Sequence, residues 1–174
     1  AKLDPELIEQ VKDEYPHLLK EPVEEEEEED YEEEEDYEED EELRITLRSS
    51  YKTLSLSEAH SMPNVSIRKK HVWGFYGHST INHNYNLETI RGDKVVVDNA
   101  TGLMWHQSGS DEYMNWNKAK EWVRSLNSSS YAGYHDWRLP TVDEAASLLE
   151  SNKRNDLYID PVFSNKQEWI WTGD

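Results

Sequence analysis

Cysteine is absent from the 174 residues of this chain, and that absence excludes several kinds of chemistry at once. Disulfides, thiolate zinc sites and cysteine nucleophiles are all ruled out. The redox compartment stays open, because a cysteine-free domain suits either side of a membrane. A folded core must therefore rest on apolar packing, for which seven Trp and ten Tyr are available.

Long apolar runs are missing as well. No stretch of about 20 apolar residues and no signal-peptide pattern occurs, so the sequence predicts no membrane span. The chain opens at Ala1 instead of an initiator Met, with Asp4 and Pro5 forming a typical helix start. Residues 1–20 are either a short amphipathic helix that docks onto a partner or, as we favour, the remnant of an upstream domain.

Basic residues are lacking from residues 21–42, where 18 of the 22 side chains are acidic. This segment carries most of the formal net charge of −20, and residues 43–174 hold 15 charges of each sign. Like-charge repulsion and low hydrophobicity predict a disordered acidic tether, which disfavours nucleic-acid binding. We favour a solvated spacer; the alternatives are a docking arm for a basic partner, a calcium-attracting tail, or tyrosine modification at Tyr31 and Tyr37.

Residues 43–90 form a lead-in whose structure the sequence defines poorly. Leu43, Ile45 and Leu47 alternate with polar residues and predict a strand. The following stretch, SEAHSMPNVSIRKKH, is interpreted as a connection broken by Pro63.

Three histidines of the lead-in raise the question of a metal site. His71, His78 and His83 are spaced by seven and five residues, which matches no common helical pair of ligands, and no nearby acid completes a cluster. We interpret them as surface or hydrogen-bonded histidines and expect no metal.

Regular patterns become clear after residue 91. GDKVVVDNATGLMWHQ predicts a hairpin with strands at 94–97 and 103–105, because Asn and Gly favour the turn between them. Apolar residues then recur at helical spacing and predict a helix over Trp116–Asn127. We expect the tryptophans to share one core, as structural anchors instead of sugar-stacking platforms: Trp105, Trp116, Trp122 and Trp137.

A second helix is predicted over Val142–Glu150. Pro140 disfavours helical dihedrals before it, and Thr141 and Glu144 have the spacing of a capping box. Arg138 is interpreted as a structural bracket for backbone carbonyls or for Asp136, although a role as a ligand cation is the alternative. The final EWIWTGD predicts a strand, with Trp169 and Trp171 on one face and Ile170 on the other.

Several motifs therefore follow one another in order: DNATGLMWHQ, WNKAKEWVRSLN, YAGYHDWRLPTVDEAASLLE, DPVFSN and WIWTGD. Together they resemble the bacterial collagen-like protein C-terminal domain family (Lcl_C) over residues 94–174. The Arg-Leu-Pro-Thr segment also resembles the stretch before a helix in formylglycine-generating enzymes and related modules. These resemblances imply a C-type-lectin-like fold.

The implied fold class is α+β: a partial C-type-lectin-like domain with two helices packed on a small mixed or antiparallel sheet, preceded by the disordered acidic segment. We place this domain at 91–174 and expect it to be C-terminally incomplete, because family members continue past the Trp-Trp-Thr strand. The resemblance places candidate ligand contacts at Trp171, Thr172 and Asp174. The catalytic cysteines of formylglycine generation and the sugar and calcium motifs of C-type lectins are absent, so we expect no catalysis and no cofactor.

The leading functional hypothesis is a non-catalytic adhesion module that binds a glycan or protein, as part of a larger bacterial surface or secreted protein. The alternative is an assembly subunit whose incomplete sheet is completed by another segment or chain. A catalytic set drawn from Ser108, His106 and Asp111 lies in one short loop, where a triad geometry has no support. We expect an extracytoplasmic location: the cell surface, the periplasm or the medium.

Overall fold

The computed structural model describes residues 44–166 and 168–174. The segments interpreted as an N-terminal helix or domain remnant and as an acidic tether lie outside the described residues. Within them the fold class is α+β, as predicted, with three α-helices and two small antiparallel sheets. The C-type-lectin-like topology stays a prediction.

The three-stranded sheet has the order β3-β4-β5, with bounds Tyr85–Ile90, Asp93–Asp98 and Leu103–His106. Its β4–β5 hairpin confirms the predicted one. Val95 and Val96 of β4 are fully buried, and Gly102 takes the left-handed φ of 71° that the turn needs. Strand β3 was not predicted, because its short alternation of Tyr85 and Leu87 with polar residues is not backed by burial: four of its six residues are exposed.

A second sheet consists of the hairpin β1–β2, Val65–His71 and Gly74–Ser79. The interpretation of residues 57–71 as a connection was therefore wrong for its second half. Exposed basic residues along β1 hide the strand from a search for apolar alternation. The short helix α2, Leu56–Ala59, packs beside this hairpin, where the His60 ring nitrogen Nε2 lies 2.7 Å from the carbonyl oxygen of Gly74.

Two predicted strands are absent from the described residues. In the segment 44–54, one backbone hydrogen bond to another backbone group is present, from the Ile45 N–H to the carbonyl of Ala100. The Arg48 carbonyl accepts from the Thr141 hydroxyl instead, so the alternating segment forms no strand. Residues 168–174 form no strand either. Their one backbone bond of this kind joins Gly173 N to the carbonyl of Pro140.

The helices α3, Trp116–Ser129, and α4, Val142–Ser147, confirm the two predicted helices with shifted ends. Asn115 caps α3 through its side chain, and Ser130 ends it in the left-handed conformation. Helix α4 is shorter than predicted, because the N–H of Glu150 donates to the carbonyl of Tyr158 and leaves the helical path.

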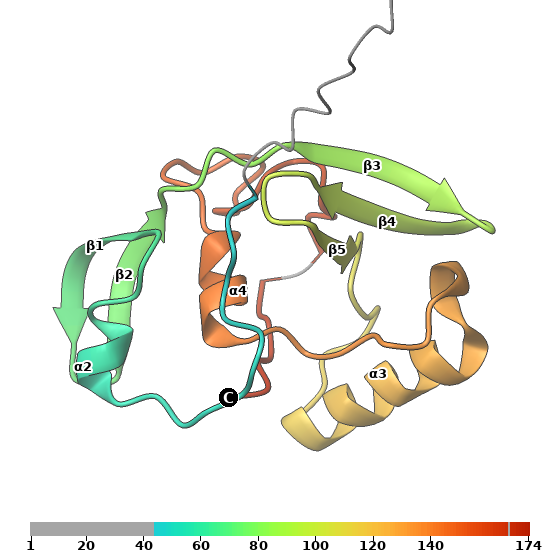
Figure 1. The fold of residues 1–174 in the computed structure, drawn as a ribbon, viewed down its shortest axis with the longest axis horizontal. Coiled ribbons are helices and arrows are strands. Elements are labelled where there is room, and N and C mark those ends of the chain that lie inside the picture. Colours follow the sequence, from blue (N-terminus) through green and yellow to red (C-terminus); the bar gives the residue numbers. More distant parts are fainter. Residues whose placement is uncertain (1–43, 167) are drawn as a thin grey trace, which may run out of the picture. The chain divides into compact units, whose positions relative to one another are not determined.

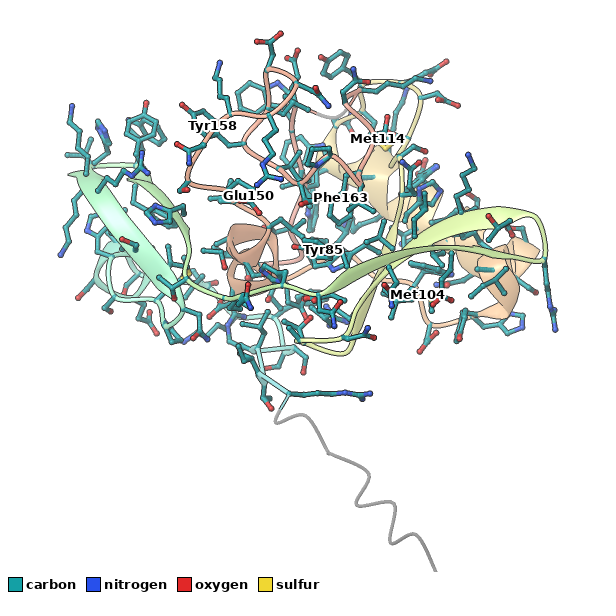
Figure 2. All side chains as sticks on the ribbon, turned by 90° about the horizontal axis from the view of Figure 1, so that it is seen from above. Tyr85, Met104, Met114, Glu150, Tyr158 and Phe163 are labelled. Atoms are coloured by element: carbon teal, nitrogen blue, oxygen red, sulfur yellow. The ribbon has the colours of Figure 1, made fainter. Side chains whose placement is uncertain are left out.

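The core lies between the three-stranded sheet, α4 and the loop that follows it. Val96, Leu148 and Phe163 are its buried centre, and Tyr85 packs edge-on against Phe163 with ring centroids 5.4 Å apart (Figure 2). Figure 1 shows α4 between the β1–β2 hairpin and the three-stranded sheet. The helix therefore joins the two sheets into one packed unit.

The expectation that the tryptophans share one buried core is wrong in part. Trp105, Trp122 and Trp137 are half-buried, but Trp116 is 39% exposed. Trp169 and Trp171 are 77% and 46% exposed. Trp169 and Trp171 line a hollow instead of lying inside the core.

Candidate functional site

A cavity of about 540 Å³ lies between β5, α3, residues 134–140 and residues 169–171. Aromatic side chains contribute much of its wall: Trp105, Trp122, Tyr134, Trp137, Trp169 and Trp171. A few polar groups join them: His106, Asp136, Arg138 and Glu144. Apolar walls with a few placed polar groups are typical of ligand sites in proteins.

Helix α3 supplies one wall because its apolar stripe faces the sheet. Ala119 and Leu126 are buried on that stripe, and Trp122 reaches the His106 ring of β5 at a centroid distance of 5.1 Å. Periodicity predicted this face correctly for Ala119, Trp122 and Leu126. Trp116 begins the helix outside the core, where Lys120 Nζ lies 3.5 Å from its ring centroid.

The opposite wall is the extended segment around Trp137. The side-chain amide of Asn127 brackets the backbone of Trp137 with two hydrogen bonds of 2.9 and 2.7 Å. The Trp137 indole N–H donates to the carbonyl of Tyr131 at 3.0 Å. These three bonds hold the indole against the cavity and satisfy its polar edge.

Arg138 forms a paired bond to Glu144, and not to Asp136 as one interpretation held. Its two terminal nitrogens donate to the two carboxylate oxygens at 2.7 and 2.6 Å, and a third bond of 3.2 Å reaches the carbonyl of Leu139. The hydrogen bond to Glu144 raises the pKa of Arg138 above its ordinary value, against the lowering effect of burial. The side chain of Glu144 is only 2% exposed, so the bracket places a charged pair at the cavity edge.

The capping box predicted at α4 is present. Glu144 N donates to the Thr141 hydroxyl at 3.2 Å, and the Glu144 carboxylate accepts from Thr141 N at 2.8 Å. Pro140 precedes the box and lines the cavity. Glu144 thus serves both the helix start and Arg138, which explains why such an acid can be buried.

The candidate ligand contacts at the end of the chain separate into two groups. Trp171 lines the cavity, and its indole N–H donates to the carbonyl of Met114 at 2.7 Å. The carbonyl of Thr172 accepts a bond from the Trp116 indole at 2.9 Å. Asp174 does not line the cavity and belongs to an ionic cluster.

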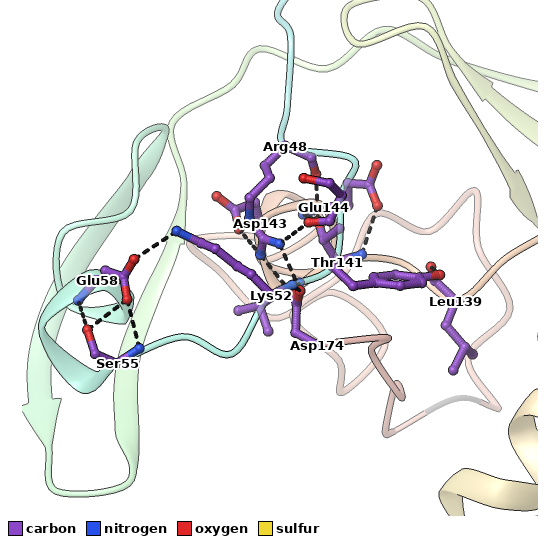
Figure 3. A network of polar contacts seen from close by, with 12 residues as sticks. Arg48, Lys52, Ser55, Glu58, Leu139, Thr141, Asp143, Glu144 and Asp174 are labelled. Carbon is purple, nitrogen blue, oxygen red and sulfur yellow. Dashed lines mark hydrogen bonds and ion pairs between the residues drawn. The ribbon is translucent and has the colours of Figure 1, made fainter.

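That ionic cluster is centred on Arg48 (Figure 3). Arg48 forms ion pairs with Asp143 and Asp174 at 2.5 and 2.7 Å, and Asp174 also accepts bonds from the backbone N–H groups of Lys52 and Val142. The Arg48 hydrogen bond is the main cause of an Asp174 pKa well below its usual range. Sequence reasoning missed Arg48, because its partners are 95 and 126 residues away.

Ser79, His83 and Asp98 lie together in an order that resembles a catalytic triad. His83 Nδ1 is 2.7 Å from the Asp98 carboxylate, and Nε2 is 3.4 Å from the Ser79 hydroxyl. However, Nε2 lies only 2.8 Å from the carbonyl of Ser147, which is an acceptor and requires a proton on that nitrogen. His83 therefore cannot take a proton from Ser79 in this arrangement, and it links β4 to α4 instead.

The other sequence candidates do not form a site. His106 Nδ1 accepts backbone bonds from Ser108 and Gly109, and the Ser108 hydroxyl donates to the carbonyl of Gly109. Asp111 pairs with Lys166 at 3.5 Å. In the described part of the chain, no three potential metal-ligating side chains gather in one place, His71 and His78 included.

Comparison with known proteins gives one match. Residues 94–174 match the family model of the Lcl C-terminal domain, which confirms the resemblance seen in the motifs. No curated protein and no solved structure matches the chain. Among the described residues, no helix has the length and apolar character needed to cross a bilayer.

Proposed function

We propose that the Lcl C-terminal domain at residues 94–174 is a non-catalytic recognition module, and that its aromatic cavity binds a glycan or a protein side chain. The observation that carries this proposal is the cavity itself. Its volume of about 540 Å³ lies within the range of roughly 300 to 1,000 Å³ that is common for ligand sites. Indole rings form both its walls and its rim.

A glycan suits this lining better than an apolar ligand does. The exposed rings of Trp169 and Trp171 present flat apolar faces to the C–H face of a sugar. Arg138 lies at the same cavity with its side chain 37% exposed and offers a charged donor to hydroxyls, whereas the buried Glu144 positions it. Their mutual ion pair holds both groups in place before a ligand arrives, which lowers the entropy lost on binding.

The histidine at the cavity supports the non-catalytic part of this proposal. Burial is the main cause of a lowered pKa at His106, so this ring tends to be neutral. Its Nδ1 accepts two backbone N–H bonds, and the proton of the neutral ring therefore resides on Nε2. A ring in this tautomer offers the cavity a donor and no base.

We further propose that the protein acts outside the cytoplasm, at the surface, in the periplasm or after secretion. The family match to a module of bacterial collagen-like proteins supports this placement. Cell fractionation of the source bacterium with an antibody to the chain tests it. Recovery of the protein with the cytoplasmic fraction alone would overturn this part.

The binding test is a glycan array probed with the 174-residue chain, followed by titration of each hit. Trp171→Ala should weaken a hit roughly tenfold or more, because central aromatic contacts commonly carry 2 kcal/mol or more of binding free energy. Tyr113→Ala is the matched control, because Tyr113 is 79% exposed and lies outside the cavity lining. Equal losses in the two variants, with both folded by circular dichroism, would refute the cavity as the site.

A second candidate function is assembly through strand addition. Strand β5 pairs with β4 on one side, and its other edge has no strand partner among the described residues. The indole N–H of Trp105, a residue of β5, is buried and lacks a hydrogen-bond partner in the described residues. An extended segment of another chain could pair with β5 and fill the cavity. Sedimentation over a wide concentration range separates the two, because strand addition predicts self-association or complex formation and glycan binding does not.

A further inference from the structure

The turn of the β1–β2 hairpin exposes two large apolar side chains. Val72 and Trp73 connect the paired residues His71 and Gly74, and their side chains are 87% and 66% exposed. Val72 is almost fully exposed at the turn, while one side of Trp73 lines a shallow hollow with Leu56 and Val142 and the rest of its ring faces outward. The indole stacks on the His71 ring at a centroid distance of 5.1 Å, which supports its orientation.

This turn departs from the usual chemistry of two-residue hairpins. Such turns favour Asn-Gly or Gly-X, because their backbones need positive φ angles. Neither Val72 nor Trp73 has a positive φ, and both are so exposed that their large side chains contribute little to the packing of the core. Residues that favour neither the turn nor the core are expected at positions where the surface has a function.

Cations follow directly behind the apolar tip. Arg68, Lys69 and Lys70 are consecutive and exposed, and residues 65–79 contain no Asp or Glu. Lys69 and Lys70 have no ion-pair partner among the described residues. The hairpin is thus a local positive charge on a chain whose formal net charge is −20.

The hairpin is also held firmly at its base. Ser79 N donates to the carbonyl of Leu149 at 2.7 Å, and an Arg68 terminal nitrogen donates to the carbonyl of Ser151 at 3.0 Å. These bonds tie both strands to the segment after α4. Because the strands are already fixed, the turn loses little conformational entropy when it inserts into a bilayer surface.

From these four observations we infer that the β1–β2 hairpin is a peripheral anchor for an anionic lipid bilayer, with Val72 and Trp73 at the headgroup boundary. Trp is favoured at that boundary, because its ring is apolar while its N–H remains hydrated. Lys69 and Lys70 would lie one step behind it, level with anionic headgroups. A projecting apolar tip suits a soft planar surface, whereas small ligands and peptides are usually bound in clefts.

The test is flotation of the 174-residue chain with vesicles of phosphatidylcholine alone or with one quarter phosphatidylglycerol. Acidic residues oppose binding, so the assay is run at about 0.15 M salt, where the Debye length is about 8 Å. We expect binding to the anionic vesicles, reduced roughly tenfold or more by Val72→Ser with Trp73→Ser. Tyr113→Ser is the matched control, because Tyr113 is 79% exposed and lies outside both the hairpin and the cavity lining.

The charge contribution is tested separately. Lys69→Gln with Lys70→Gln should weaken binding to the anionic vesicles by about 5-fold for each lysine. Lys118→Gln with Lys153→Gln removes the same charge from exposed positions elsewhere and should leave binding within about 2-fold of the wild type.

Three results would overturn the inference. They are no vesicle binding by the wild type, equal losses in the hairpin and control variants, or binding to a soluble acidic peptide but not to vesicles. The last result would assign the hairpin to a protein partner. Because the cavity variants are scored on glycans and the hairpin variants on vesicles, this inference and the proposed function fail independently.

Discussion

Arg138→Met is the substitution whose effect the structure defines most sharply. The guanidinium donates to both carboxylate oxygens of Glu144, whose side chain is 2% exposed. When the guanidinium is removed, the buried Glu144 carboxylate keeps one hydrogen bond in the described residues, which it accepts from the backbone N–H of Thr141 at 2.8 Å. The variant therefore leaves a charge in a poorly solvated position with most of its partners removed.

Breaking a buried ion pair in this way costs about 3–5 kcal/mol. The Arg138 side chain is 37% exposed, so water can partly replace the guanidinium, and we expect a loss at the lower end, about 3 kcal/mol. Urea denaturation followed by circular dichroism measures it. The midpoint should fall while the slope stays constant, because the surface exposed on unfolding is unchanged.

Two further variants make the measurement decisive. Arg154→Met removes an exposed pair, 3.9 Å from Asp160, and should change the free energy of unfolding by about 0–1 kcal/mol. Adding Glu144→Gln to Arg138→Met removes the unpaired charge, so the double variant should be more stable than Arg138→Met alone. Similar losses at Arg138 and Arg154, or a double variant less stable than the single one, would refute this reasoning.

Two other predictions concern acids. The pKa of Asp174 is lowered by its bond to Arg48, so its contribution is present above its unfolded pKa near 3.8 and is lost as pH falls. Between about pH 5 and pH 2 the wild type should lose more free energy of unfolding than Asp174→Asn does, as pH-dependent urea denaturation will show; parallel curves would contradict this. Asp98→Asn should destabilise the fold by about 2 kcal/mol or more, because Asp98 is 1% exposed and its carboxylate lies 2.7 Å from His83 Nδ1 and accepts bonds from the Ala100 N–H and the Thr101 hydroxyl. Thermal unfolding measures that loss, and an unchanged midpoint would argue against a structural role for this pair.

Local signals explain which parts of the fold were predictable. The Thr141–Glu144 capping box and the turn before Gly102 depend on residues three to five positions apart, and both were predicted correctly. Helix α3 was predicted from its 3.6-residue period. Its first residue, Trp116, was wrongly expected to be buried. Periodicity shows which face of the helix a side chain lies on, but it does not show whether the sheet extends far enough to cover that part of the face.

Long-range contacts explain most of what was missed. Arg48 and Asp174 are 126 positions apart in the sequence, and no local pattern around either residue indicates that the two will pair. The same holds for the cavity, whose walls come from β5, α3 and the last residues. Strands β1 and β3 were missed for a different reason, since each alternates over about four residues and then continues into polar, largely exposed positions. The family match concerns the segment after residue 93, where the local signals are dense.

The Arg48 cluster has a mechanical consequence. It binds Asp174 to Arg48 and Lys52 and to the first turn of α4 (Figure 3). A pulling force on Asp174 would load these few ionic bonds first, while the strands of both sheets stay unstressed. Rupture of the Arg48 ion pairs, before any loss of strand pairing, would then set the force at which the unit begins to unfold.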